Sequence, residues 1–195
     1  EFRRVLFRSL DPNSWVLGSS LLNKGCVAYL RCNLREAAEY VAAAKRLADT
    51  TGHAGLASAT EITLGHIDLL TGDFRRAEAN AARVLNNSQS PTFTTIAASE
   101  GLSRIYLALN RLDDCAAALR FVETTAVACE GSGSIYHVRW AGITKARLLL
   151  KLGQPHVAVR RLEEMETSAS DLHDVPFRAA IHIDRKSTRL NSSHT

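Results

Sequence analysis

The sequence predicts an all-α protein of antiparallel helical hairpins stacked as a solenoid. Two observations point to helices: apolar residues recur at spacings of three and four, and turn-forming residues separate pairs of such segments. The third observation is one motif that occurs four times, at intervals of 40, 38 and 43 residues. Repeats of this length are typical of units that bury their apolar faces on one another.

The repeated motif begins at a turn residue and has an apolar residue or proline two positions later. A small residue comes three positions after that, and another apolar residue four positions further on. The small residues are Ala37, Ala77, Cys115 and Ala158. Because a small side chain lets two helix axes approach closely, we expect a helix crossing at each of these positions.

The turns between paired helices have residues suited to ending one helix and starting the next. Gly72, Asn110 and Gly153 can adopt the left-handed conformation that ends a helix. Asp73 can cap the following helix, and Pro155 falls in a first turn, where proline is tolerated. A second set of small residues precedes the turn residues by seven positions: Gly25, Gly65, Ser103 and Ala146.

These signals give a helix for each half of every hairpin. First helices are expected over 14–30, 57–70, 94–109 and 136–152. Second helices are expected within 32–48, 72–85, 110–123 and 153–166. Loops are expected at 53–55, 86–91, 129–134 and 168–176, and a fifth hairpin opens with a helix over 175–183.

The second unit resembles a tetratricopeptide repeat. The pattern of that family is a Leu-Gly pair, an aromatic residue, a turn glycine, a second aromatic residue and an alanine. The matching residues are Leu64, Gly65, Gly72, Phe74 and Ala77, while Asp68 stands in place of the first aromatic residue. The third unit keeps Leu102, Tyr106, Leu112 and Cys115.

The spacing of these units departs from the usual tetratricopeptide period of 34 residues. Longer units resemble the MalT-like helical region of large bacterial signalling regulators. The resemblance implies a right-handed superhelix in which the first helices of successive hairpins line a concave groove.

The two ends of the chain share an unusual relationship at the level of codons. Permitted codons for residues 1–9 and 184–194 spell inverted copies of one string, which resembles a common short-read sequencing adapter. We therefore expect residues 1–9 and 184–195 to be adapter-derived and not native. Residues 10–183 are then the native helical repeat domain, a fragment of a longer array.

Leaving out these ends changes the charge of the chain. The whole chain has 24 basic and 20 acidic residues, a net charge of +4. The ends contain six of the basic and two of the acidic residues, so 18 of each remain and the net charge is zero. A neutral chain lacks the basic character typical of nucleic-acid or membrane binding, and we expect neither partner.

Cysteine usage and hydropathy indicate the compartment. The four cysteines form no CxxC pair, so we interpret them as reduced thiols of a cytoplasmic protein. No apolar run reaches the roughly 18 residues of a membrane span.

The residue patterns of common enzymes are missing. The histidines form no HExxH motif, and no G-x-S-x-G elbow occurs. The Gly-x-Gly of 129–137 is followed by no Lys-Ser or Lys-Thr pair, and adjacent carboxylates such as Asp113 and Asp114 diverge on a helix. We expect no catalytic residue, no cofactor and no metal site.

The expected groove supplies the candidate binding residues. The residue after each small position of a first helix would point into it: Cys26, His66, Arg104 and Arg147. With their neighbours, the groove candidates are Tyr29, His66, Leu69, Glu100, Arg104, Trp140, Arg147 and Lys151. Such a weakly basic, partly aromatic channel suits an acidic or amphipathic peptide. The alternative is that these are ordinary half-exposed helix residues.

The expected function is therefore a non-catalytic protein-interaction scaffold or sensor module. It belongs to the repeat region of a multidomain bacterial signalling or transcriptional regulator. The alternatives are a repeat region appended to an enzyme, such as a signalling kinase, and a helical-repeat nucleic-acid binder, against which the neutral charge argues.

Overall fold

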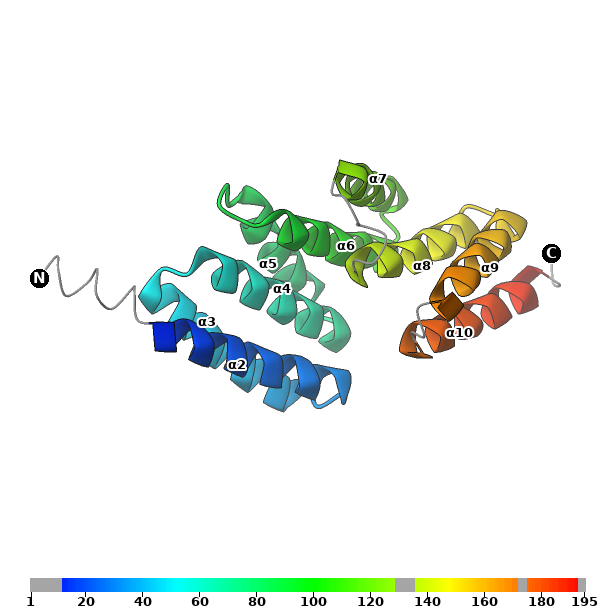
Figure 1. Cartoon of the computed structure of the whole chain (residues 1–195). Helices are drawn as coiled ribbons and strands as arrows, with labels where there is room; N and C mark the ends of the chain where they lie inside the picture. Colours follow the sequence, from blue (N-terminus) through cyan, green and yellow to red (C-terminus); the bar gives the residue numbers. More distant parts are fainter. Residues whose placement is uncertain (1–11, 129–135, 172–174, 193–195) are drawn as a thin grey trace, which may run out of the picture. The chain divides into compact units, whose positions relative to one another are not determined.

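The computed structural model describes residues 12–128, 136–171 and 175–192, and these residues form helices and short turns with no strand. The first five helices are α2 (Pro12–Leu30), α3 (Leu34–Thr51), α4 (Ala54–Thr71), α5 (Phe74–Asn86) and α6 (Thr92–Ala108) (Figure 1). The others are α7 (Leu112–Ala128), α8 (Tyr136–Lys151), α9 (Pro155–Asp171) and α10 (Val175–Ser192).

The chain divides into two compact units, Glu1–Gly101 and Leu102–Thr195, and the boundary between them falls inside α6. In the N-terminal unit, α2 packs on α3, α3 on α4, and α4 on α5. In the C-terminal unit, α7 packs on α8, α8 on α9, and α9 on α10. Helices thus pack on their neighbours along the chain, which confirms the predicted all-α class and is compatible with a helical repeat.

The four hairpin turns share one backbone geometry. Each turn residue has a positive φ: 59° at Cys32, 83° at Gly72, 58° at Asn110 and 73° at Gly153. The next amide donates to the carbonyl five residues earlier, at 2.8–2.9 Å, and the donors are Asn33, Asp73, Arg111 and Gln154. This bond defines the Schellman ending of a helix, so the predicted turn register is confirmed in all four hairpins.

Cys32 joins the three turn residues named from the sequence. A residue with a Cβ adopts the left-handed conformation at a cost of about 1–2 kcal/mol, which glycine avoids. The Cys32 amide donates to the Tyr29 carbonyl at 2.9 Å, and the Asn33 amide donates to Ala28. These two bonds satisfy the end of α2 and hold the turn in that conformation.

The second helix of each hairpin starts in the same way. The amide of each predicted small residue donates to the residue four before it at 3.0–3.1 Å, and these donors are Ala37, Ala77, Cys115 and Ala158. At α5 the Asp73 side chain also accepts from the Arg76 amide at 3.1 Å. Pro155 is the first residue of α9. The predicted cap and the predicted proline position are both confirmed.

The small residues lie at close helix crossings. A Cβ placed on Gly25 of α2 would lie 2.5 Å from Cγ2 of Val41 and 3.3 Å from the Ala37 carbonyl oxygen. A Cβ on Gly65 of α4 would lie 3.3 Å from the Cβ of Asn80 and 3.5 Å from the carbonyl oxygen of Ala77. In both hairpins the glycine of the first helix therefore faces the small residue of the second, and the crossing expected at that small residue is confirmed.

The C-terminal unit uses the same positions with other small residues. Ala146 and Ala158 are buried in one apolar cluster with Leu162. Ser103 and Cys115 are both fully buried.

Two expected loops differ from the structure at their edges. Residues 53–55 were expected to be a loop, but α4 begins at Ala54, because Gly52 (φ 74°) ends α3 and the His53 carbonyl accepts from the Ala57 amide. Helix α9 continues to Asp171, so the expected loop at 168–176 is shorter. The expected loop at 129–134 lies outside the described residues.

Residues 184–192 continue α10 beyond the predicted helix over 175–183. The adapter origin of residues 1–9 and 184–195 stays a prediction. Residues 1–9 lie outside the described part of the chain.

We predict that Ala77→Leu lowers the free energy of unfolding by roughly 1–3 kcal/mol, because added methylene groups overpack a close crossing. Ala77 is buried, whereas Ala79, two residues later on α5, is exposed. Ala79→Leu is therefore the matched control and should change stability by less than about 0.5 kcal/mol. Urea titrations of both variants measure the difference, and equal losses would show that the register is wrong.

Candidate polypeptide-binding face

Helix α4 has two stripes of side chains that serve different purposes. One stripe faces α5 and holds Glu61, Gly65 and Asp68, at spacings of four and three residues. A second stripe, about a third of a turn round the helix, holds Gly55, Ala59, His66 and Leu69. Both stripes belong to one rigid helix. The contacts that hold the first stripe against α5 therefore also set the direction in which the second stripe faces.

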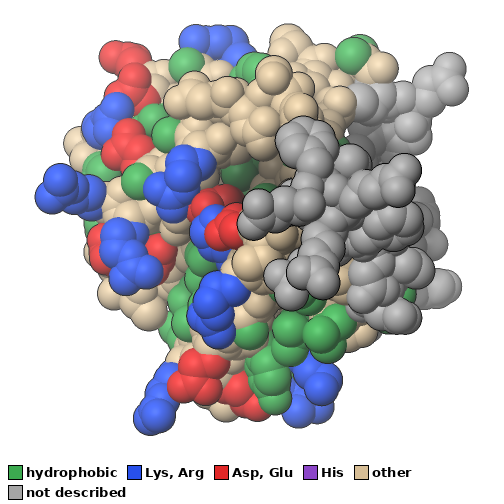
Figure 2. Space-filling model, turned by 90° about the vertical axis from the view of Figure 1, so that its left-hand side faces the viewer, with side chains coloured by type: hydrophobic (Ala, Val, Ile, Leu, Met, Phe, Trp, Pro, Cys, Tyr) green, Lys and Arg blue, Asp and Glu red, His purple; other side chains and the backbone are tan. Residues whose placement is uncertain are grey.

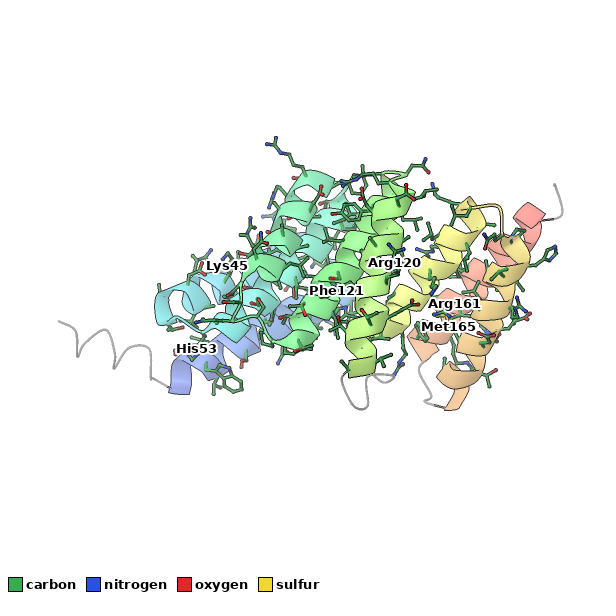
Figure 3. All side chains as sticks on the ribbon, turned by 90° about the horizontal axis from the view of Figure 1, so that it is seen from above. Lys45, His53, Arg120, Phe121, Arg161 and Met165 are labelled. Carbon is green, nitrogen blue, oxygen red and sulfur yellow. The ribbon has the colours of Figure 1, made fainter. Side chains whose placement is uncertain are left out.

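The first stripe is tied to both neighbouring helices by the buried carboxylate of Glu61. Lys45 of α3 lies 2.8 Å from Glu61 Oε1. Arg83 of α5 donates to Glu61 Oε2 from Nη2 at 2.8 Å and from Nε at 3.1 Å. One side chain therefore joins three helices. Its partner on α3, Lys45, is labelled in Figure 3.

The pKa of Glu61 shows that these partners outweigh burial. Burial acts to raise this pKa, whereas hydrogen bonds and charges from Arg83 and Lys45 lower it, and the net direction is down. Glu61 is therefore ionised in the fold and has a structural role rather than that of a general acid.

Asp68 lies two turns further along the same stripe. It accepts a hydrogen bond from Asn80 of α5 at 2.8 Å, and Arg76 lies 3.3 Å away. Burial raises the pKa of Asp68, and Arg76 opposes the rise. The residue that stands in place of the aromatic position of the repeat is thus a buried polar contact between α4 and α5.

The second stripe joins a wider surface, which we call the first-helix face. Helix α2 contributes Trp15, Ser19, Leu22, Cys26 and Tyr29 to this face. Helix α4 contributes Gly55, Ala59, His66 and Leu69, and α6 contributes Phe93 near its start. The rings of Tyr29 and His66 lie 6.4 Å apart at 32°. Two groove residues predicted on separate helices therefore lie side by side.

Glu100 has a different environment from the other groove candidates of this unit. Its side chain is 1% exposed, and its Oε2 lies 3.6 Å from Nε2 of His66. Gly101 follows it, where a Cβ would lie 3.3 Å from the same His66 nitrogen. The carboxylate of Glu100 thus lies beneath the surface, whereas Tyr29, His66 and Leu69 are half-buried.

The groove candidates of the C-terminal unit are engaged within that unit. Trp140 packs against Phe177 of α10, with ring centroids 5.8 Å apart. Arg147 donates to both oxygens of Asp184 at 3.0–3.1 Å. Lys151 donates to Asn110 at 3.2 Å.

Arg104 is half-buried on α6. Arg147, another cation predicted to line the groove, forms its ion pair with Asp184 of α10. Asp184 belongs to the segment that is expected to be adapter-derived.

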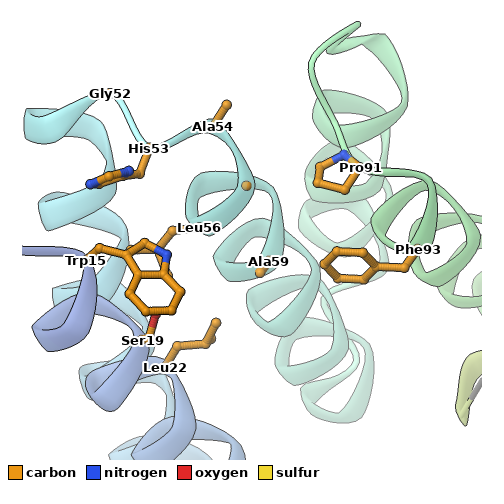
Figure 4. Close-up of a pocket in the computed structure, with 11 residues that line it drawn as sticks. Trp15, Ser19, Leu22, Gly52, His53, Ala54, Leu56, Ala59, Pro91 and Phe93 are labelled. Carbon is orange, nitrogen blue, oxygen red and sulfur yellow. The ribbon is translucent and has the colours of Figure 1, made fainter. Parts of the chain in front are cut away.

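The structure adds a pocket to the first-helix face that the sequence analysis missed. A cavity of about 390 Å³ lies between α2, the start of α4 and the start of α6. Figure 4 shows Trp15 and His53 on one side, Pro91 and Phe93 on the other, and Ala59 between them. Trp15 and Phe93 are 53% and 55% exposed.

Part of this pocket could have been found from the sequence. Leu22 and Trp15 precede Tyr29 by seven and fourteen residues, so the groove stripe extends back along α2 to Trp15. Phe93 gave no such signal, because its position depends on how α6 starts after the 86–91 loop.

The described cysteines are free thiols, and two of them are shielded by burial. Cys26, Cys32 and Cys115 form no disulfide. Burial raises the pKa of Cys115 to about 11. Burial also raises the pKa of Cys26, opposed by a hydrogen bond with Thr63. A thiol with a raised pKa is mostly protonated at neutral pH and is a poor nucleophile.

Charge and hydropathy add two general observations. Acidic and basic side chains are interspersed over the face shown in Figure 2. Among the described helices, none combines the length and the apolar composition needed to cross a bilayer.

No family profile matches the chain, and no curated protein or solved structure matches it significantly.

We predict that Glu61→Gln lowers the free energy of unfolding at pH 7 by about 1–2 kcal/mol, since hydrogen bonds between charged groups contribute on that scale. Because the pKa of Glu61 is lowered in the fold, its stabilisation is present above its ordinary value of 4.5 and is lost as the pH falls through the folded pKa. The variant should therefore lose less stability than the wild type on acidification.

The control for this prediction is Glu39→Gln, whose ion pair with Arg35 is exposed at 3.3 Å. Urea titrations from pH 7 down to roughly pH 2 compare the two variants, because the stabilisation is lost only below the ordinary pKa of the carboxyl. An equal effect of both at pH 7, or an unchanged acid dependence of Glu61→Gln, would contradict the structural role of Glu61.

Proposed function

We propose that this chain is a tetratricopeptide-type repeat module that binds a polypeptide segment of a partner on its first-helix face. The module is non-catalytic and acts as an interaction scaffold or sensor. Its ligand is an amphipathic segment whose apolar side covers the aromatic and aliphatic residues of α2 and α4.

One observation carries this proposal: side chains of successive first helices meet in a continuous row. Tyr29 and His66 lie with ring centroids 6.4 Å apart, and Trp15 and Phe93 present open aromatic rings further along the same face. Clusters of exposed aromatic residues on a protein surface are typical of interaction sites. A row that crosses several helices suits an extended or helical segment.

The tetratricopeptide assignment is supported by the four hairpins of common register. Every turn has one residue in the left-handed conformation, followed five positions later by the small residue of the next helix. The intervals of 40, 38 and 43 residues suit the longer, MalT-like version of the repeat. We propose that the module belongs to a multidomain bacterial signalling or transcriptional regulator. The free thiols of the described cysteines suit a reducing, cytoplasmic setting.

The test is selection of peptide ligands from a random display library on the full chain, followed by affinity measurements on variants. Tyr29→Ala should weaken the selected peptides at least tenfold, about 1.4 kcal/mol, because an aromatic anchor of the face is removed. Fluorescence anisotropy with labelled peptides gives the dissociation constants.

Tyr40→Ala is the matched control. Tyr40 is also a half-buried tyrosine of the first hairpin, but it lies on the second helix, α3. Its replacement should change affinity by less than twofold, and circular dichroism should show equal helix content in both variants. Selection of no peptide, or equal effects of the two replacements, would contradict binding on the first-helix face.

A further inference from the structure

The pocket between Trp15 and Phe93 has the form of a slot for a ring. Trp15 of α2 and Phe93 of α6 form opposite walls, and Ala59 of α4 lies between them (Figure 4). Gly55 of α4 also lines the pocket. A Cβ at Gly18 of α2 would lie 2.4 Å from Cδ2 of Leu56 on α4. The absence of a side chain at Gly18 therefore lets the two helices approach each other beside the pocket. We propose that this pocket receives one aromatic side chain, Trp, Tyr or Phe, of the partner polypeptide.

The composition of the lining selects a neutral apolar occupant. Among the described residues around the cavity there is no Asp, Glu, Lys or Arg, and His53 is the one titratable side chain of that set. A charged group inserted here would lose hydration without gaining a partner of opposite charge. An aromatic ring instead gains contact with Trp15, Phe93 and Pro91, and aromatic pairs add about 0.5–1.5 kcal/mol beyond the area that they bury.

The size of the pocket agrees with one large side chain. A cavity of about 390 Å³ is at the small end of the range for ligand sites. Gly55 keeps this space open: a Cβ there would lie 3.8 Å from Cγ of Pro91, an ordinary contact, so a larger residue would project into the slot.

Two features favour a side chain of a polypeptide over a free small molecule. Sites for small molecules enclose most of the ligand, whereas both aromatic walls here are more than half exposed. Trp15, Leu22 and Tyr29 are seven residues apart and therefore lie on one side of α2, so a chain leaving the pocket can follow the rest of the first-helix face. This inference rests on the proposed function and specifies one position of its ligand.

A double-mutant cycle on the selected peptides tests the inference. The peptides should share one aromatic position, and its replacement by Ala should weaken binding to the full chain at least tenfold. Trp15→Ala should weaken binding of the unchanged peptides to a similar extent. The Ala-substituted peptide should bind the Trp15→Ala chain no more weakly than it binds the wild-type chain, since both replacements remove the same contact. Ala59→Leu places a larger side chain in the pocket between Trp15 and Phe93, so it should also weaken binding at least tenfold. Phe121→Ala, an equally accessible ring on α7 at 44% exposure, is the control and should have no effect.

Several outcomes would overturn the inference. Peptides that need Tyr29 but bind Trp15→Ala normally would exclude the pocket and leave the proposed function standing. Independent, multiplying effects of the two changes would also exclude it. Concentration-dependent association of the chain that Trp15→Ala abolishes would show that a second copy covers the pocket.

A small probe tests the pocket without any selected peptide. N-acetyl-tryptophanamide should shift the indole N–H signal of Trp15 in NMR spectra, and N-acetyl-leucinamide at the same concentration should shift it at least threefold less. Trp140→Phe assigns the two indole signals, because the chain has two tryptophans. Equal shifts with both probes would contradict an aromatic slot.

Discussion

The crossing of α4 and α5 at Gly65 is the contact on which the N-terminal unit depends. With no side chain at Gly65, Asn80 and the Ala77 carbonyl of α5 come within van der Waals distance of α4. Polar contacts flank the crossing on both sides, Glu61 with Arg83 and Asp68 with Asn80. Together they fix the rotation of α4 about its axis. The second stripe, from Ala59 to Leu69, lies about a third of a turn round α4, so it faces away from α5 and forms part of the first-helix face.

The same constraint explains why the hairpins resemble one another despite different side chains. A left-handed turn residue ends the first helix, and the amide of the small residue forms one of the earliest hydrogen bonds of the second. This local geometry tolerates Gly, Asn or even Cys at the turn, although a residue with a Cβ costs more there. What must be kept is the fixed spacing between the turn and the two small positions, because that spacing aligns the crossing.

The fold could be predicted from sequence because its determinants are local. Turn residues, caps and small positions lie within twelve residues of one another, and every hairpin repeats them. The site was harder, because exposure depends on helices that are distant in sequence. Tyr29 and His66 lie together as the stripe pattern implies, yet Glu100 on a similar stripe is buried. Trp140 is covered by Phe177, and Phe93 faces Trp15 across a pocket that no local pattern indicates.

A backbone NMR measurement on the full chain tests the shared register most directly. Amide-to-Hα couplings and chemical shifts report φ residue by residue, and Cys32 and Asn110 are the decisive positions because neither is glycine. The shared register predicts φ near +60° at both residues, directly after helical residues. Helical values near −63° at either position would mean that the helix runs on through the turn. The small residues would then not meet at the crossings, and the first-helix face would lose its basis.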